Sequence, residues 1–123
     1  MELTVKEIQS QIVDIPMRPP AILDSAIAAF YGVDTREVNQ AVSRNPKKFP
    51  PDFCFQLTME EVGFVRKNRS QIVIKYAGEK VRPRAFTREG CNMLATILGS
   101  DIAIDRCIQI IRVFSAMEAE CVR

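Results

Sequence analysis

Five polar side chains between residues 36 and 44 have the types and the spacing needed to read the edges of DNA bases. An Arg side chain can bind guanine O6 and N7 together, and Asn or Gln can bind adenine N6 and N7 in the same way. On a helix these side chains would lie opposite Val38, Ala41 and Val42, whose spacing of three and four residues predicts a buried face. The five candidate base-reading residues are Arg36, Asn39, Gln40, Ser43 and Arg44.

A pair of short helices would position this polar face. Asp24 or Ser25 can cap the first helix, and Gly32 suits a left-handed stop at its end. The second helix, which Asp34 or Thr35 can cap, is expected over residues 35–45, because Pro46 cannot continue it. This is the pattern of a helix-turn-helix, whose second helix enters the major groove. An ordinary pair of core helices has the same periodicity and stays open as the alternative.

Positive charge is concentrated around and after this helix pair. The 123 residues carry a net charge of only +2, but residues 36–88 hold twelve Lys or Arg and five acids, an excess of seven. A surface that faces phosphates needs such a concentration, although a merely solvated face would look the same. A basic strand within this segment could track a DNA backbone, or its charges could protect a sheet edge. The candidate phosphate-binding residues are Lys47, Lys48, Arg82, Arg84 and Arg88.

Few residue patterns in this chain point to enzymatic chemistry. It has no His, so the commonest general base and the commonest metal ligand are both absent. The pairs Asp24–Ser25 and Thr87–Glu89 could join a nucleophile to an acid, but these residue types are also ordinary helix caps. We therefore expect no enzyme activity and no cofactor or metal. The four widely spaced cysteines, without a C-x-x-C pair, are expected to be small buried side chains: Cys54, Cys91, Cys107 and Cys121.

The beginning of the chain, Met-Glu-Leu-Thr-Val-Lys, has neither the basic nor the apolar part of a signal peptide. No apolar run approaches the roughly eighteen residues of a membrane span. We therefore expect a cytoplasmic protein that does not bind membranes.

The remaining patterns predict one compact α+β domain over residues 1–123, with a helix-turn-helix-like pair, short β-hairpins and a long C-terminal helix. Pro83 should make the second arm of the later hairpin an edge strand or an irregular strand. The expected elements outside the helix pair are a strand or hairpin in 3–15, a strand in 53–57, a helix in 58–65, a hairpin with arms 72–76 and 80–86, and helices over 87–98 and from 100 onward. A capping box in Thr58-Met-Glu-Glu61 begins the first of these helices, and Thr87 and Ser100 cap the other two.

The last helix carries an apolar stripe at helical spacing, and further apolar residues make it wider than one packing face needs. The extra width could serve the core or a homodimer. The stripe consists of Ile104, Cys107, Ile108, Ile111 and Phe114, and it is widened by Ala103, Ile110, Val113 and Met117.

Several blocks of the chain resemble the KilA-N-type DNA-binding domains of phages, in the branch described as the N-terminal domain of a phage open reading frame six protein. The similarity covers residues 22–117 and departs from the family pattern at Pro16–Pro20. It is carried by Ile22-Leu-Asp-Ser-Ala-Ile-Ala-Ala-Phe-Tyr-Gly-Val33, Val38-Asn-Gln-Ala-Val-Ser-Arg-Asn45, Lys48-Phe-Pro-Pro-Asp-Phe-Cys-Phe-Gln-Leu-Thr-Met-Glu-Glu61, Arg84-Ala-Phe-Thr-Arg-Glu-Gly-Cys-Asn-Met-Leu94 and Ala103-Ile-Asp-Arg-Cys-Ile-Gln-Ile-Ile-Arg-Val-Phe114. The resemblance implies a DNA-binding module of phage or prophage regulatory proteins, often placed ahead of an effector domain, and not an enzyme.

The residues and the resemblance together predict a regulatory domain that binds double-stranded DNA, with helix 35–45 in the major groove and the neighbouring cations on phosphates. The expected partners besides DNA are a second copy through the C-terminal helix and an effector domain or a repressor. The main alternative is an antirepressor-like module that binds proteins and not DNA. A nuclease would need clustered carboxylates, which the spacing of Glu60, Glu61 and Glu89 does not provide.

Overall fold

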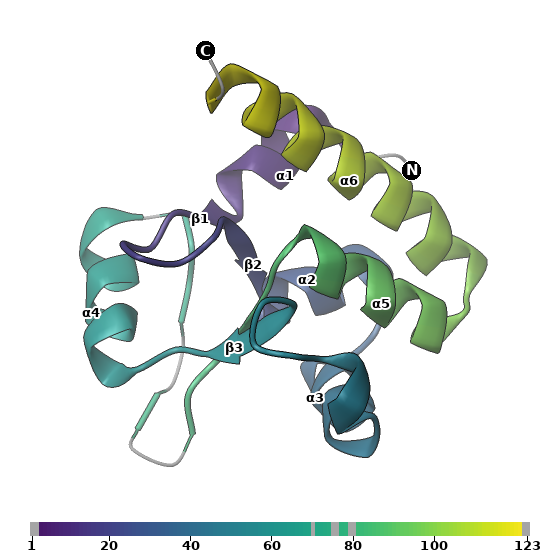
Figure 1. Cartoon of the computed structure of the whole chain (residues 1–123), viewed down its shortest axis with the longest axis horizontal. Helices are drawn as coiled ribbons and strands as arrows, with labels where there is room; N and C mark the ends of the chain where they lie inside the picture. The colour runs from purple at the N-terminus through teal and green to yellow at the C-terminus, as the bar shows by residue number, and fades with distance from the viewer. Residues whose placement is uncertain (1–2, 70, 75–76, 79–80, 122–123) are drawn as a thin grey trace.

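Four short strands form one antiparallel sheet in the middle of the fold (Figure 1). The computed structural model describes residues 3–69, 71–74, 77–78 and 81–121. The sheet has the strand order β1-β2-β4-β3, so the strand that is last in the sequence lies between two earlier ones. The strands are β1 (Ile12–Val13), β2 (Ala21–Leu23), β3 (Cys54–Gln56) and β4 (Arg84–Phe86).

Both faces of this sheet are buried. Ile22, Phe86 and Cys54 are register partners on three adjacent strands, and they belong to the larger apolar cluster with the helices that follow β2 and β4. Their neighbours Leu23 and Ala85 lie in a second cluster together with the helix that follows β3. Because side chains alternate along a strand, these few residues serve two cores at once.

Six α-helices and one 3-10 turn surround the sheet among the described residues. Figure 1 shows α4 on one side of the strands and α2, α5 and α6 on the other, with α3 at the lower edge. The α+β fold expected from the sequence is therefore confirmed. The elements are α1 (Val5–Ser10), α2 (Asp24–Tyr31), α3 (Thr35–Arg44), η1 (Pro46–Lys48), α4 (Met59–Asn68), α5 (Arg88–Leu98) and α6 (Asp101–Cys121).

The first fifteen residues differ from the expected strand or hairpin, because a helix comes first. Thr4 caps α1 by accepting a hydrogen bond from the Glu7 N–H at 3.1 Å, and Ile8 is buried. Only Ile12–Val13 forms a strand here, and it pairs with Ala21–Leu23 across the proline-containing loop. In this segment the Thr4 cap therefore indicates the observed helix better than the content of β-branched residues indicates a strand.

The later hairpin is also corrected. Residues 72–74 form no strand, residues 75–76 and 79–80 lie outside the described part of the chain, and Arg84–Phe86 pairs with β2 and β3. The strand after Pro83 is therefore an interior strand and not an edge. Pro83 itself precedes the ladder, where its missing N–H removes none of the strand's hydrogen bonds.

Helix α4 begins with the predicted capping box. Thr58 accepts from the Glu61 N–H at 3.1 Å, and the Glu61 carboxylate accepts from the Thr58 N–H at 2.9 Å. Arg18 reaches Glu61 from the loop after β1 with two hydrogen bonds of 2.7 and 3.1 Å, and its guanidinium lies 4.2 Å from the centre of the Phe55 ring. The bond from Arg18 holds the pKa of the Glu61 carboxyl below its ordinary value. The helix continues to Asn68, beyond the expected end at residue 65.

Helix α5 approaches the chain before β3 so closely that only glycine fits at residue 90. A Cβ built on Gly90 would lie 1.9 Å from the backbone oxygen of Phe53. Thr87 fixes this contact, because its N–H donates to Phe53 O at 3.0 Å and its hydroxyl donates to Asp52 O at 2.8 Å. The block Ala85-Phe-Thr-Arg-Glu-Gly90 therefore joins a strand, a cap and a close helix contact in six residues.

Helix α6 packs through only part of the expected apolar stripe, together with three of the residues that widen it. Ile104 and Ile108 lie outside the packing face and are 44% and 45% exposed. Ser100 caps the helix as expected, since its hydroxyl accepts from the Ala103 N–H at 3.1 Å. The buried residues of α6 are Ala103, Cys107, Ile110, Val113 and Phe114.

Three of the cysteines are buried and free, as expected, and the side chain of Cys121 is outside the described part. Burial raises the pKa of the Cys54 thiol to about 12 and also raises that of Cys91 and Cys107. Over the described residues, none of the helices is both long and apolar enough to cross a membrane.

Candidate nucleic-acid interface

The turn between α2 and α3 is built on Gly32. Its φ of 71° is left-handed, and the N–H groups of Gly32 and Val33 donate to carbonyl oxygens of the last turn of α2. Asp34 precedes α3 as predicted, but its side chain makes no capping hydrogen bond. The sequence predicted Asp24 or Ser25 as the cap of α2, but Leu23 holds that position and Asp24 is the first residue of the helix.

Helix α3 has one buried and one exposed side. Val38 and Ala41 are buried against the core, where Ala28 of α2 is also buried. The opposite side continues into η1 and carries six exposed polar side chains, which we call the α3–η1 surface. It consists of Arg36, Gln40, Ser43, Arg44, Lys47 and Lys48.

The α3–η1 surface contains four cations, and in the part of the chain that the structure describes none of them forms an ion pair. Asn45 holds the junction between α3 and η1, since its amide donates to Ala41 O at 2.9 Å. Glu37 lies in the first turn, where a carboxylate favours the positive end of the helix. The arrangement can therefore present donors and positive charge to an anionic partner.

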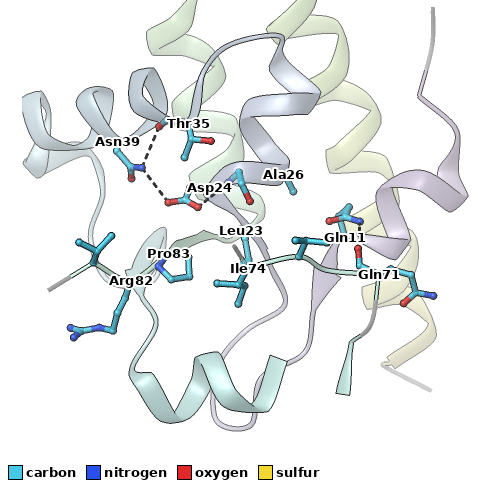
Figure 2. Close-up of a pocket in the computed structure, with 13 residues that line it drawn as sticks. Gln11, Leu23, Asp24, Ala26, Thr35, Asn39, Gln71, Ile74, Arg82 and Pro83 are labelled. Carbon is cyan, nitrogen blue, oxygen red and sulfur yellow. Dashed lines mark hydrogen bonds between the residues drawn. The ribbon is translucent and has the colours of Figure 1, made fainter. Parts of the chain in front are cut away.

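Asn39 does not share this exposed surface, although the sequence placed it there. Its amide nitrogen donates to Asp24 Oδ2 and to Thr35 O, each at 3.2 Å, as Figure 2 shows. Its amide oxygen accepts from Arg84 Nη1 at 2.7 Å. The structure thus brings Asn39 and Arg84 together as bracing contacts between α3 and the sheet.

Asp24 is the centre of this network, a role that the sequence did not predict. It is 7% exposed, and its carboxylate accepts from the backbone N–H groups of Ser25 at 2.8 Å and Arg84 at 3.2 Å, besides the bond from Asn39. A buried carboxylate needs such partners. Its place directly after an apolar strand is common to N-caps, so the sequence contained no separate signal for this role.

A groove of about 600 Å³ lies beside the network (Figure 2). It runs past Asp24 and Asn39 toward Gln11, whose amide donates to Gln71 O at 3.2 Å. The apolar part of its lining includes Leu23, Ile74 and Pro83. The groove separates the N-terminal ends of α2 and α3 from the segment that leads into β4.

The remaining predicted basic residues are placed away from the α3–η1 surface or held by other groups. Arg82 Nε donates to Leu57 O at 2.8 Å, which holds it at the turn before α4. Arg88 Nη1 forms an ion pair with Glu118 Oε2 at 2.7 Å and so connects α5 to the C-terminal part of α6. Arg82 therefore precedes β4 and Arg84 lies within it, and their hydrogen bonds to Leu57 O and Asn39 keep the two from forming one basic surface along a strand.

Comparison with protein-family models matches residues 3–97 to the ORF6N domain. The chain belongs to the ORF6N domain family. ORF6N is a domain family of phage type. Its match includes the strands, the helix pair and nearly all of α5, so the network around Asp24 and the α3–η1 surface are both parts of the ORF6N domain. Searches of curated proteins and of solved structures found no match.

Proposed function

We propose that this ORF6N domain binds double-stranded DNA, with α3 in the major groove and η1 on the phosphate backbone. The observation that carries the proposal is the α3–η1 surface, which follows a glycine turn and is held by buried contacts on its other side. Arg36, Gln40 and Arg44 supply the donors that recognise base edges, while Lys47 and Lys48 follow at the helix end where phosphates would lie. Ser43 lies between Gln40 and Arg44 in the sequence, and its hydroxyl can bind a base edge or a phosphate.

Asn39 and Arg84 have a supporting role in this proposal, because their hydrogen bonds set the position of α3 relative to the sheet. A recognition helix needs a fixed position if its side chains are to meet particular bases. Arg82 and Arg88 lie outside the α3–η1 surface and add positive charge at the turn before α4 and on α5. The resemblance to KilA-N-type domains supports the same class of function, a phage or prophage regulator.

The test is a fluorescence anisotropy titration with duplex DNA of mixed sequence, at low and at physiological salt. We expect binding that weakens steeply as salt rises, because phosphate contacts release counterions. Absence of binding at low salt would contradict the proposal and favour the antirepressor-like alternative, which a pull-down with a repressor would examine.

Two substitutions separate base reading from phosphate binding once a preferred site has been selected. Gln40→Ala should change the order of preference among related sites, with a loss of about 1–3 kcal/mol at the affected base pair. Lys48→Ala should weaken binding to all sequences by a similar factor. Lys67→Ala, at an exposed lysine of α4, is the matched control and should leave binding unchanged. Equal effects of Gln40→Ala and Lys48→Ala on every site would contradict the assigned roles.

A further inference from the structure

The exposed isoleucines of α6 form a continuous apolar stripe. Ile104 and Ile108 are 44% and 45% exposed, and half-buried Ile111 and exposed Ser115 continue the line. Their successive spacings of four, three and four residues are those of a seam between two packed helices. Single exposed apolar residues are normal on a protein surface, whereas a periodic line along one helix indicates an interface.

This stripe lies beside the face that α6 uses within the chain and does not coincide with it. The buried face is centred on Ile110, with Cys107 and Phe114 at its edge, while the stripe is turned about a third of the helix circumference away, at roughly 100° per residue. Figure 1 shows α6 along the outer edge of the molecule, with α1 and α5 beneath it. Ile104, Ile108 and Ser115 therefore stay exposed after the chain has folded, and Ile111 stays partly exposed.

Between residues 104 and 115, the charged residues that border the stripe lie on its outer side. Asp105 and Arg112 lie there, one heptad apart and both exposed. The corresponding positions on the inner border, Cys107 and Phe114, are buried within the chain. In a parallel pair of helices, the outer border of one helix faces the inner border of the other. In an antiparallel pair, the two outer borders face each other, and so do the two inner borders. An antiparallel pair would place Asp105 opposite Arg112 of the second copy, twice by symmetry.

We propose that two copies of this chain associate through α6 in antiparallel orientation, with Ile104, Ile108 and Ile111 forming the apolar seam. The charge pattern selects the second copy as the occupant, because the same surface supplies both the acid and the base that complete each pair. The proposal does not depend on DNA binding, since it concerns a different helix and is tested without DNA.

Sedimentation equilibrium from micromolar to submillimolar concentration tests the association. The wild-type chain should reach twice the monomer mass, and Ile104→Lys with Ile108→Lys should raise the dimer dissociation constant at least tenfold, because two charges would enter the seam. Val73→Lys is the matched control, at an apolar side chain 63% exposed outside α6, and it should change nothing. A wild-type chain that stays monomeric throughout this range would overturn the proposal.

The orientation is tested by charge exchange. Asp105→Arg and Arg112→Asp should each weaken the dimer severalfold, and the two together should restore it, because the exchanged charges attract again in an antiparallel pair. Failure of the double variant to recover would overturn the antiparallel pairing.

Cysteine cross-linking in a Cys121→Ser background tests the orientation of the two α6 helices independently. Ile108→Cys lies near the middle of the seam and should form a dimer-linking disulfide. With Ile104→Cys, the two introduced thiols, one in each copy, would lie more than about 12 Å apart along the helix, beyond the reach of a disulfide. Equal cross-linking at both positions would indicate a parallel pair and overturn the proposal.

Discussion

The neighbouring residues Asn39 and Gln40 of α3 have different contacts, so we expect their substitutions to change stability by different amounts. Asn39 gives both its amide groups to Asp24, Thr35 and Arg84, while the next residue, Gln40, is exposed. Asn39→Ala should lower the free energy of unfolding by about 1–3 kcal/mol, because it leaves a buried carboxylate with one partner fewer. Gln40→Ala is the matched control and should change it by less than about 0.5 kcal/mol. Urea denaturation of both variants measures this, and equal losses would contradict the bracing role.

The bond between Arg18 and Glu61 makes part of the stability depend on pH. Since the folded pKa of Glu61 lies below its ordinary value of about 4.3, the folded state favours the charged form. This contribution is complete above that value and is lost as the pH falls through the folded pKa. Glu61→Gln keeps an acceptor for the capping box but removes the charge. The difference in unfolding free energy between the wild type and Glu61→Gln should therefore be constant near neutral pH and shrink below about pH 4.

Denaturation midpoints measured from neutral pH down to about pH 3 would check this. A difference that stays constant over the whole range would show that the Arg18 bond does not shift the titration of Glu61.

Residue types predicted the composition of the site but not the partners of each side chain. The exposed positions of Arg36, Gln40, Ser43 and Arg44 follow from helical periodicity alone, and they agree with the structure. Asn39 lies at the border of the exposed face, and its inward contact depends on Asp24 and on a strand 45 residues later. Such a contact depends on tertiary structure, which local periodicity cannot contain.

At the scale of elements, two glycines on helices give opposite expectations. Gly63 lies within α4 with nothing within 4 Å of an added Cβ, so Gly63→Ala should stabilise the fold by about 0.5–1 kcal/mol through helix propensity. Gly90→Ala would force its Cβ against Phe53 O and should cost at least about 2–3 kcal/mol. Thermal melts of the two variants check this pair. A Gly90→Ala variant as stable as the wild type would contradict the close approach of α5.

Elements with strong local signals were predicted well from the sequence. The capping box at Thr58, the caps at Thr87 and Ser100 and the glycine turn at Gly32 agree with the structure because each is decided within a few residues. Helix α1 is only six residues long, and its apolar content obscured a single Thr cap. The pairing of β4 depends on strands far away in the chain, so neither its partners nor its central place could be read from residues 72–86.

At the scale of the whole molecule, the proposed DNA binding and the proposed association of α6 together give an expected number of phosphate contacts. If two copies bind one DNA together, each substituted lysine removes two contacts, and a single chain would lose one. Lys48→Ala should therefore reduce the slope of log affinity against log salt by about two for a dimer, compared with about one for a monomer. Anisotropy titrations at several salt concentrations measure the slope. The Ile104→Lys with Ile108→Lys background, in which the loss should fall to about one, is the control.

The central position of β4 has a consequence for how this protein is made. Strand β4, which pairs with both β2 and β3, is the last strand of the sheet to leave the ribosome. Neither apolar cluster can therefore be completed before residue 86 has been synthesised. A nascent chain that ends before Arg84 has its helix-turn-helix sequence in full but lacks the strand that supports it. We therefore expect that the helix pair does not fold as an isolated peptide and that a fragment carrying it has to include β4.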